Sequence, residues 1–155
     1  MIGVFNFMRW LEKNCMFYYS NTDRVEYITI NSTGNASSFG TLSTGGAYHP
    51  DGSSNATNER ALNAGAQYGG SSTAIVYFTV NSASNSTSFG NLFEARAAGA
   101  GSCGSGVNDR CFWWGGDESD NIQYTTISST QNASDFGNLT DDGVSQGGTA
   151  DAGGC

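Results

Sequence analysis

A fifteen-residue phrase recurs three times along the chain and constrains its fold more than any other feature. The copies span Ile28–Leu42, Phe78–Leu92 and Thr125–Leu139, and each ends in Phe-Gly-x-Leu. A tyrosine precedes the phenylalanine by 12 residues in every copy, and the copies are spaced by 50 and then 47 residues. Periods of this size are typical of proteins that build one small sheet per repeat, as propeller blades do. The sequence therefore predicts three equivalent units.

The residues of each unit favour strands over helices. The chain has 22 glycines and one proline, and no segment keeps an apolar face at helical spacing. In Val25–Ile30, apolar side chains alternate onto both faces, which indicates an interior strand. Phe-Gly-x-Leu supplies a core ring, a glycine that permits close backbone approach, and a second core side chain. We expect an all-β fold with long surface loops at Ser43–Asn55 and Ala97–Gly106.

The units predict a simple division of the chain. An apolar N-terminal arm, residues 1–14, precedes a three-repeat β domain, residues 15–155, with repeats at about 15–60, 61–109 and 110–155. The arm either docks on another protein or packs within its own subunit. No strand follows the third copy, so a neighbouring chain or the segment Cys15–Tyr19 is expected to supply an edge.

The number of units predicts association between chains. Three blade-like units are too few to close a propeller of four to eight blades. The hydrophobic fraction is 37%, which is low for a chain that must bury a core without help. We therefore expect the fold to be completed by oligomerisation, as a ring of chains, as an open stack or as another trimeric assembly.

Charge and hydropathy exclude two classes of partner. The formal net charge is −8 and the six basic residues are scattered, so a nucleic-acid backbone would be repelled. The longest apolar stretch, residues 1–8, is too short to span a membrane and follows no basic segment of the kind that opens an export signal. We expect no nucleic-acid partner and no membrane span.

The sequence contains no recognisable catalytic or metal-binding pattern. His49 is the single histidine and lies in a loop that the other copies lack, which favours an exposed loop residue over the base of a triad. The four cysteines show no CxxC spacing of a zinc site. Asp117, Glu118 and Asp120 share a turn but match no calcium-loop spacing. We predict a non-enzymatic protein without cofactor or metal.

Two weaker hypotheses concern particular side chains. The pair Trp113 and Trp114 offers an aromatic platform for a glycan, although a strand usually buries one ring of such a pair. Cys103 and Cys111 are close enough in sequence to form a disulfide across one bend, which would suit an extracellular particle. The alternative is that these cysteines remain thiols.

Three segments carry a resemblance to a known class of proteins. They are Arg110–Gly116, Val25–Ile30 and Gly34–Leu42, which correspond approximately to Arg-Gly-x-Phe-x-Gly-Gly, Ile-x-Tyr-Ile-Thr-Ile and Gly-Asn-Ala-x-x-Phe-Gly-x-Leu. In these motifs the chain resembles the kelch-like β-propeller repeat proteins of tailed bacteriophage virions, especially marine ones. The likeness covers about residues 15–140. The first copy lacks the double glycine, and the arginine that often follows Phe-Gly-x-Leu appears only as Arg96.

The resemblance implies a viral structural role. It implies a virion protein of a fibre, tail appendage or capsid-surface decoration, which contacts copies of itself and other virion proteins and attaches to host-surface glycans. Its location would be the extracellular particle. Two alternatives from other classes are a secreted carbohydrate-binding module or propeller-enzyme fragment, and a subunit of an extracellular filament.

Overall fold

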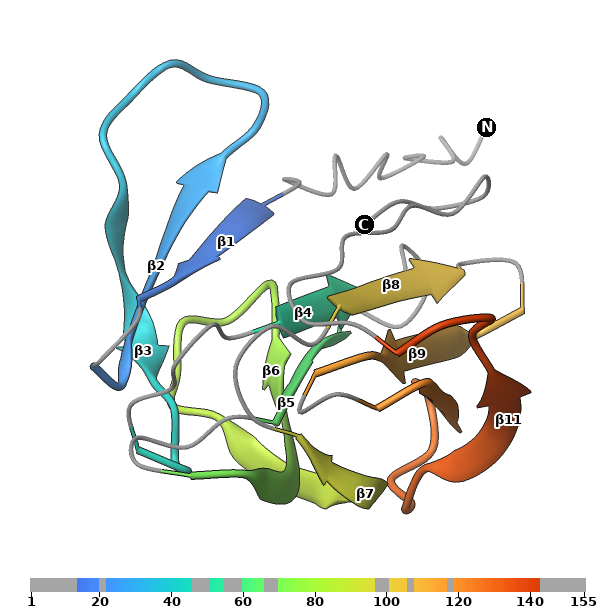
Figure 1. Cartoon of the computed structure of the whole chain (residues 1–155). Coiled ribbons are helices and arrows are strands. Elements are labelled where there is room, and N and C mark those ends of the chain that lie inside the picture. The colour runs from blue at the N-terminus through green and yellow to red at the C-terminus, as the bar shows by residue number, and fades with distance from the viewer. Residues whose placement is uncertain are drawn as a thin grey trace, which may run out of the picture.

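The computed structural model describes residues 14–19, 22–45, 51–54, 60–65, 70–96, 101–105, 108–116 and 119–142, and these residues are all-β (Figure 1). Three antiparallel sheets have the strand orders β1-β2-β3, β4-β5-β6-β7 and β11-β10-β9-β8. The predicted all-β class is confirmed. The strands are β1 (Asn14–Tyr18), β2 (Arg24–Thr29), β3 (Ser37–Thr41), β4 (Asp51–Ser54), β5 (Arg60–Ala64), β6 (Ser72–Thr79), β7 (Thr87–Arg96), β8 (Gly101–Ser105), β9 (Arg110–Trp114), β10 (Asn121–Thr126) and β11 (Ser134–Asn138).

Each sequence repeat contributes the same three strands to its own sheet. The tyrosine strands β2, β6 and β10 are interior, and the Phe-Gly strands β3, β7 and β11 pair along one side of them. Tyr27, Tyr77 and Tyr124 occupy the same register position, opposite Met16, Leu62 and Phe112 on the strand of the other side. The three copies therefore adopt equivalent extended conformations, as the spacing predicts.

A β-bulge at the motif phenylalanine is common to the three sheets. Val25 pairs with Gly40, but the next residue of β2 pairs with Ser38, so Phe39 is the extra residue. The same shift occurs beside Gly90 and beside Gly137. A bulge bends the strand and re-aims the side chain that it carries. In each sheet the ring packs edge-on against the repeat's tyrosine, at centroid distances of 5.5, 6.0 and 5.8 Å along the chain.

The first strands of the second and third sheets lie in segments that the sequence pattern assigns to surface loops. β4 pairs with β5, and β8 pairs with β9. β4 and β8 lie side by side (Figure 1). The loop interpretation is wrong for these stretches, because backbone pairing does not require the apolar side chains that mark other strands.

The sequence pattern predicts that the third repeat needs an added edge strand, but in the described chain the first sheet has fewer strands than the third. The third sheet has four strands, whereas the described part of the first has only β1, β2 and β3. Asn14–Tyr18 pairs with β2 of its own sheet and is not the edge of another. The first 13 residues of the N-terminal arm, and His49, lie outside the described residues.

The core lies between consecutive repeats. One buried cluster joins the first two sheets through residues that include Val25, Phe39 and Phe78. A second buried cluster joins the second and third sheets through residues that include Leu62, Phe89 and Trp113. Each sheet is thus buried by its neighbour in sequence, an arrangement that is typical of repeat architectures.

Candidate assembly surfaces

The Phe-Gly strand of one repeat meets the loop that precedes the Phe-Gly strand of the next, and we call this contact the Phe-Gly joint. The first joint links β3 to the β6–β7 loop, and the second links β7 to the β10–β11 loop. Phe39 is 4% exposed in the first joint, and its ring lies edge-on to that of Phe78 at 5.7 Å. Phe89 is 2% exposed in the second. The phenylalanine of the motif therefore fills the space between two sheets.

The glycine of the motif allows two backbones to touch at each joint. A Cβ added to Gly40 would lie 2.0 Å from the Ser84 carbonyl oxygen. A Cβ added to Gly90 would lie 2.2 Å from the Gln131 carbonyl oxygen. Real carbon and oxygen atoms do not approach so closely, and the obstacle is backbone that cannot rotate away. Only glycine fits at these two positions without displacing the neighbouring repeat.

Hydrogen bonds hold the same atoms in both joints. The Thr41 N–H donates to Asn85 Oδ1 at 3.1 Å, and the Ser86 N–H donates to the Thr41 carbonyl at 2.9 Å. In the second joint, the Asn91 N–H donates to Asn132 Oδ1 at 3.0 Å. The residue after Asn132 then donates its N–H to the Asn91 carbonyl at 2.8 Å. One asparagine and three backbone groups thus define each joint.

A side chain at the start of β1 or β5 adds another bond to each joint. Asn14 Nδ2 donates to the Val80 carbonyl at 2.8 Å, and an Arg60 guanidinium N–H donates to the Ile127 carbonyl at 3.0 Å. Asn14 and Arg60 occupy the same register position of their sheets. The contact is therefore periodic, although the residue type changes.

The second joint is further reinforced by buried polar groups. Arg96 is 1% exposed, and its guanidinium donates to the Gly115 carbonyl at 2.8 Å and to both oxygens of Asn121 at 3.0 Å. The fully buried Gln123 accepts from the Glu94 N–H at 2.9 Å and donates to the Glu94 carbonyl at 3.2 Å. A buried cation requires such partners, because its desolvation is otherwise costly.

The third Phe-Gly strand carries the same motif, but in the described chain no loop of a further repeat lies against its glycine. Phe136 is 53% exposed, and a Cβ on Gly137 would meet no atom within 4 Å. Arg110, at the register position of Arg60, lies over its own Tyr124 ring at 4.7 Å. We call this surface the open C-terminal face, formed by Arg110, Phe136, Gly137 and Asn138.

The first repeat shows the complementary exposure. Ile30 is 59% exposed, whereas Ile127 at the corresponding position of the third repeat is fully buried. A Cβ on Gly34, the counterpart of Ser84 and Gln131, would meet nothing within 4 Å, and Asn35 is exposed. We call this surface the open N-terminal face, formed by Ile28, Ile30, Gly34, Asn35 and Ala36.

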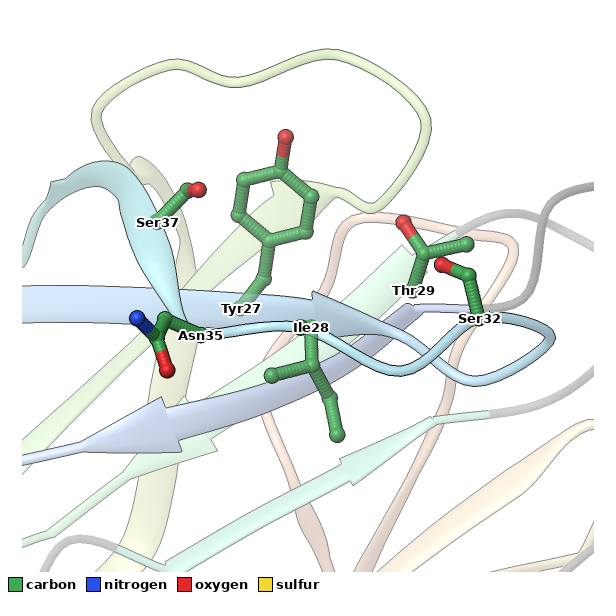
Figure 2. Close-up of a pocket in the computed structure, with 7 residues that line it drawn as sticks. Tyr27, Ile28, Thr29, Ser32, Asn35 and Ser37 are labelled. Carbon is green, nitrogen blue, oxygen red and sulfur yellow. The ribbon is translucent and has the colours of Figure 1, made fainter.

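A hollow of about 110 Å³ lies within the open N-terminal face. Tyr27 and Thr29 point to one side of β2 and Ile28 to the other, while the loop with Asn35 runs beside the strand (Figure 2). The lining is mainly polar and is completed by Ser32, Gly34 and Ser37. The hollow lies where the equivalent loop of the second repeat receives Gly40.

A buried carboxylate in the first sheet has its own partners. Glu26 is 7% exposed, accepts from the Tyr19 hydroxyl at 2.6 Å and pairs with Arg24. The hydrogen bond to Glu26 raises the pKa of Tyr19. Burial raises the pKa of Tyr18 far above its usual value, with smaller contributions from the Cys111 and Cys15 thiols, so this phenol stays protonated.

The structure separates the residues of the two weaker hypotheses. Trp113 is 1% exposed and belongs to the core, so only the half-buried Trp114 retains surface for a ligand. Cys103 pairs with Phe112, and Cys111 pairs with Gly104. Because neighbouring positions of a strand point to opposite faces, Cys103 and Cys111 lie on opposite sides of the sheet. The register does not bring the two sulfur atoms together.

The sequence pattern alone gives no role in the joints to three of their contributors. The asparagine five residues before each motif glycine recurs in all three copies as Asn35, Asn85 and Asn132, which is the available signal. Arg60 and Arg96 have no such signal, because neither residue type recurs at its position in all three copies.

The described ranges show neither a metal cluster nor a spanning helix. No group of three or more histidine, cysteine, aspartate or glutamate residues is placed there to hold a metal ion. No helix in that part of the chain has the length and apolar character needed to cross a membrane. No protein-family model matches the chain, and no curated protein matches it.

Proposed function

We propose that this chain is a non-enzymatic structural protein of a bacteriophage virion. It would serve in a fibre, tail appendage or capsid-surface decoration, where it supports assembly and host-surface adhesion. The observation that carries the proposal is the repetition of one joint twice along the chain. At both joints a glycine, an asparagine and a buried phenylalanine ring of the motif hold successive sheets together.

The exposed loops supply the adhesive part of the proposal. Residues 31–38 and the loop 81–85 are exposed and rich in serine, threonine and asparagine. Such side chains offer donors and acceptors to glycan hydroxyls or to adjacent subunits, while the sheets below them stay rigid. The viral setting comes from the resemblance of the repeat motifs to kelch-like phage repeats.

Labelling of purified particles tests the viral role. Antibodies against the chain, bound to intact particles and imaged by electron microscopy, are expected to mark the particle surface at regular positions. Peptides of the chain are expected in the same particles by mass spectrometry, at a constant ratio to the capsid protein. Absence of both signals from purified particles would reject the viral assignment.

Trp114 supports a second candidate, a carbohydrate-binding module. It is partly exposed at the end of β9, and aromatic faces stack on sugars. On a glycan array, Trp114→Ala is expected to abolish binding. Phe93→Ala removes another aromatic side chain, 60% exposed, and serves as the matched control. Equal binding by both variants would reject this candidate.

A further inference from the structure

The two open faces of the chain are the separate halves of the joint that the chain forms twice internally. The open C-terminal face presents Phe136, Gly137 and Asn138, in the positions that Phe39, Gly40 and Thr41 occupy in the first joint. The open N-terminal face presents Gly34, Asn35 and Ala36, in the positions of Ser84, Asn85 and Ser86.

We propose that a second copy of this chain fills the gap, with the open C-terminal face of one copy docking on the open N-terminal face of the next. The Asn138 N–H would donate to Asn35 Oδ1 of the second copy, and the Ala36 N–H of the second copy would donate to the Asn138 carbonyl. Because Gly137 has no side chain, the Gly34 carbonyl of the second copy would have room to lie against it. These are the bonds that hold Thr41 and Asn91 at 2.8 to 3.1 Å.

The exposed apolar groups match as well. Phe39 packs on Phe78, and Ile28 stands at the corresponding position of the first repeat. Phe136, 53% exposed, would therefore cover Ile28 of the second copy. Of the large apolar side chains that are exposed in the described chain, Phe136 and Ile30 both have buried counterparts in the second joint, Phe89 and Ile127.

Arg110 supplies the last contact of the set. Asn14 and Arg60 donate to the carbonyls of Val80 and Ile127, and the corresponding carbonyl of the first repeat belongs to Ile30. Arg110 of one copy would reach Ile30 of the next. Every periodic contact of the internal joints thus has both of its halves on this chain, which identifies the occupant as another copy.

The pairing is head-to-tail, so its geometry allows two outcomes. Heterologous contacts close into rings when the rotation permits and otherwise grow into open filaments. Two chains of three sheets give six sheets, within the range of four to eight blades that form closed propellers. A ring buries both open faces of every copy, and a filament leaves only the two faces at its ends exposed. The inference rests on the proposed assembly role and names its partner.

The test is the mass of the purified chain by light scattering over a range of concentrations. The expected mass is at least twice the 16.2 kDa of one chain. Association should strengthen with added salt, because the net charge of −8 on each copy repels the other and salt screens that repulsion. A mass of one chain at every concentration and salt level would overturn the proposal.

Variants on opposite faces identify the joint. Asn35→Ala and Phe136→Ala are each expected to weaken association about tenfold or more, since 1.4 kcal/mol corresponds to a factor of ten. Gly34→Ser is the matched control and should associate normally, because the second repeat has serine at this position of its joint. Asn35→Ala keeps the test valid if Phe136→Ala fails to fold. Unchanged association of Asn35→Ala would overturn the proposal.

Mixing the two weakened variants tests whether the copies dock head-to-tail. The Asn35→Ala chain keeps a complete C-terminal face, and the Phe136→Ala chain keeps a complete N-terminal face. Their equimolar mixture therefore contains one intact joint, and native mass spectrometry should detect more heterodimer than the twofold excess over each homodimer that random pairing gives. A random distribution of pairs would overturn head-to-tail docking. These measurements use no particles, so their failure is distinguishable from failure of the viral assignment.

Discussion

The second joint and the open C-terminal face carry the same motif in opposite circumstances. Phe89 and Phe136 both pack edge-on against the tyrosine of their own repeat, yet one is 2% exposed and the other 53%. The Gln131 carbonyl oxygen lies against Gly90, whereas no atom of the described chain would contact a Cβ on Gly137. The packing within a sheet is therefore fixed by the repeat itself, and burial is fixed by the next repeat. Substitutions at paired positions should separate these two contributions.

The largest difference is expected at the motif phenylalanines. Phe89→Ala should destabilise the chain by about 3–5 kcal/mol, because it leaves a cavity between two sheets. Phe136→Ala should cost about 1 kcal/mol in the dissociated chain, because half of its ring is already in water. Urea unfolding at low protein concentration measures both values. Equal losses would show that the two faces do not differ in burial.

The glycines should show the next largest effect. Gly90→Ala places a methyl group where the Gln131 carbonyl stands, and we expect a loss of about 3 kcal/mol with weaker coupling between the sheets. Gly34→Ala adds the same methyl group in open space and should change stability by at most about 0.5 kcal/mol. Thermal unfolding of both variants provides the comparison. A tolerated Gly90→Ala would contradict the close approach at the joint.

The arginines compare a buried hydrogen-bond network with an ion pair whose arginine is exposed. Arg96→Met keeps much of the side-chain volume but leaves the oxygens of Gly115 and Asn121 without their donor, and should cost about 2 kcal/mol. Arg24→Met removes one partner of the buried Glu26 carboxylate, but the arginine side chain is 60% exposed and the Tyr19 hydroxyl still donates to Glu26, so the loss should be smaller, about 1 kcal/mol. Chemical denaturation checks both, and the reverse ranking would refute the role of Arg96 in the second joint.

The asparagines give the smallest and most specific comparison. Asn132→Ala removes one acceptor from the second joint and should cost about 1 kcal/mol. Asn35→Ala removes an exposed side chain and should leave the unfolding free energy of the dissociated chain unchanged within about 0.5 kcal/mol, while it weakens self-association. Measuring each variant by both unfolding and light scattering distinguishes an internal contact from an intermolecular one.

The repeated motif makes the sheets predictable but not their surroundings. Residue type and recurrence predict Phe39 and Phe89 in the core, and their burial confirms this. The same reasoning cannot separate Phe136 from them, because its exposure depends on the absence of a further repeat in the described chain. Local sequence carries information on strand conformation, whereas burial is a property of the neighbour.

Strand pairing and register are the other gaps. β4 and β8 consist largely of glycine and serine, so side-chain patterns give no sign that their backbones pair with β5 and β9. Cys103 and Cys111 are near in sequence, but a one-residue difference in register places them on opposite faces. The prediction that one ring of the tryptophan pair is buried is confirmed by Trp113.

Because the joint is built mainly from backbone atoms, one asparagine and one glycine, it has a consequence for inheritance. A genetic duplication of a segment of 47 to 50 residues would arrive with both halves of the contact already encoded. The rest of each copy is then free to diverge, as the turns between strands have done. Such a gene can lengthen or shorten by whole modules without evolving a new fit.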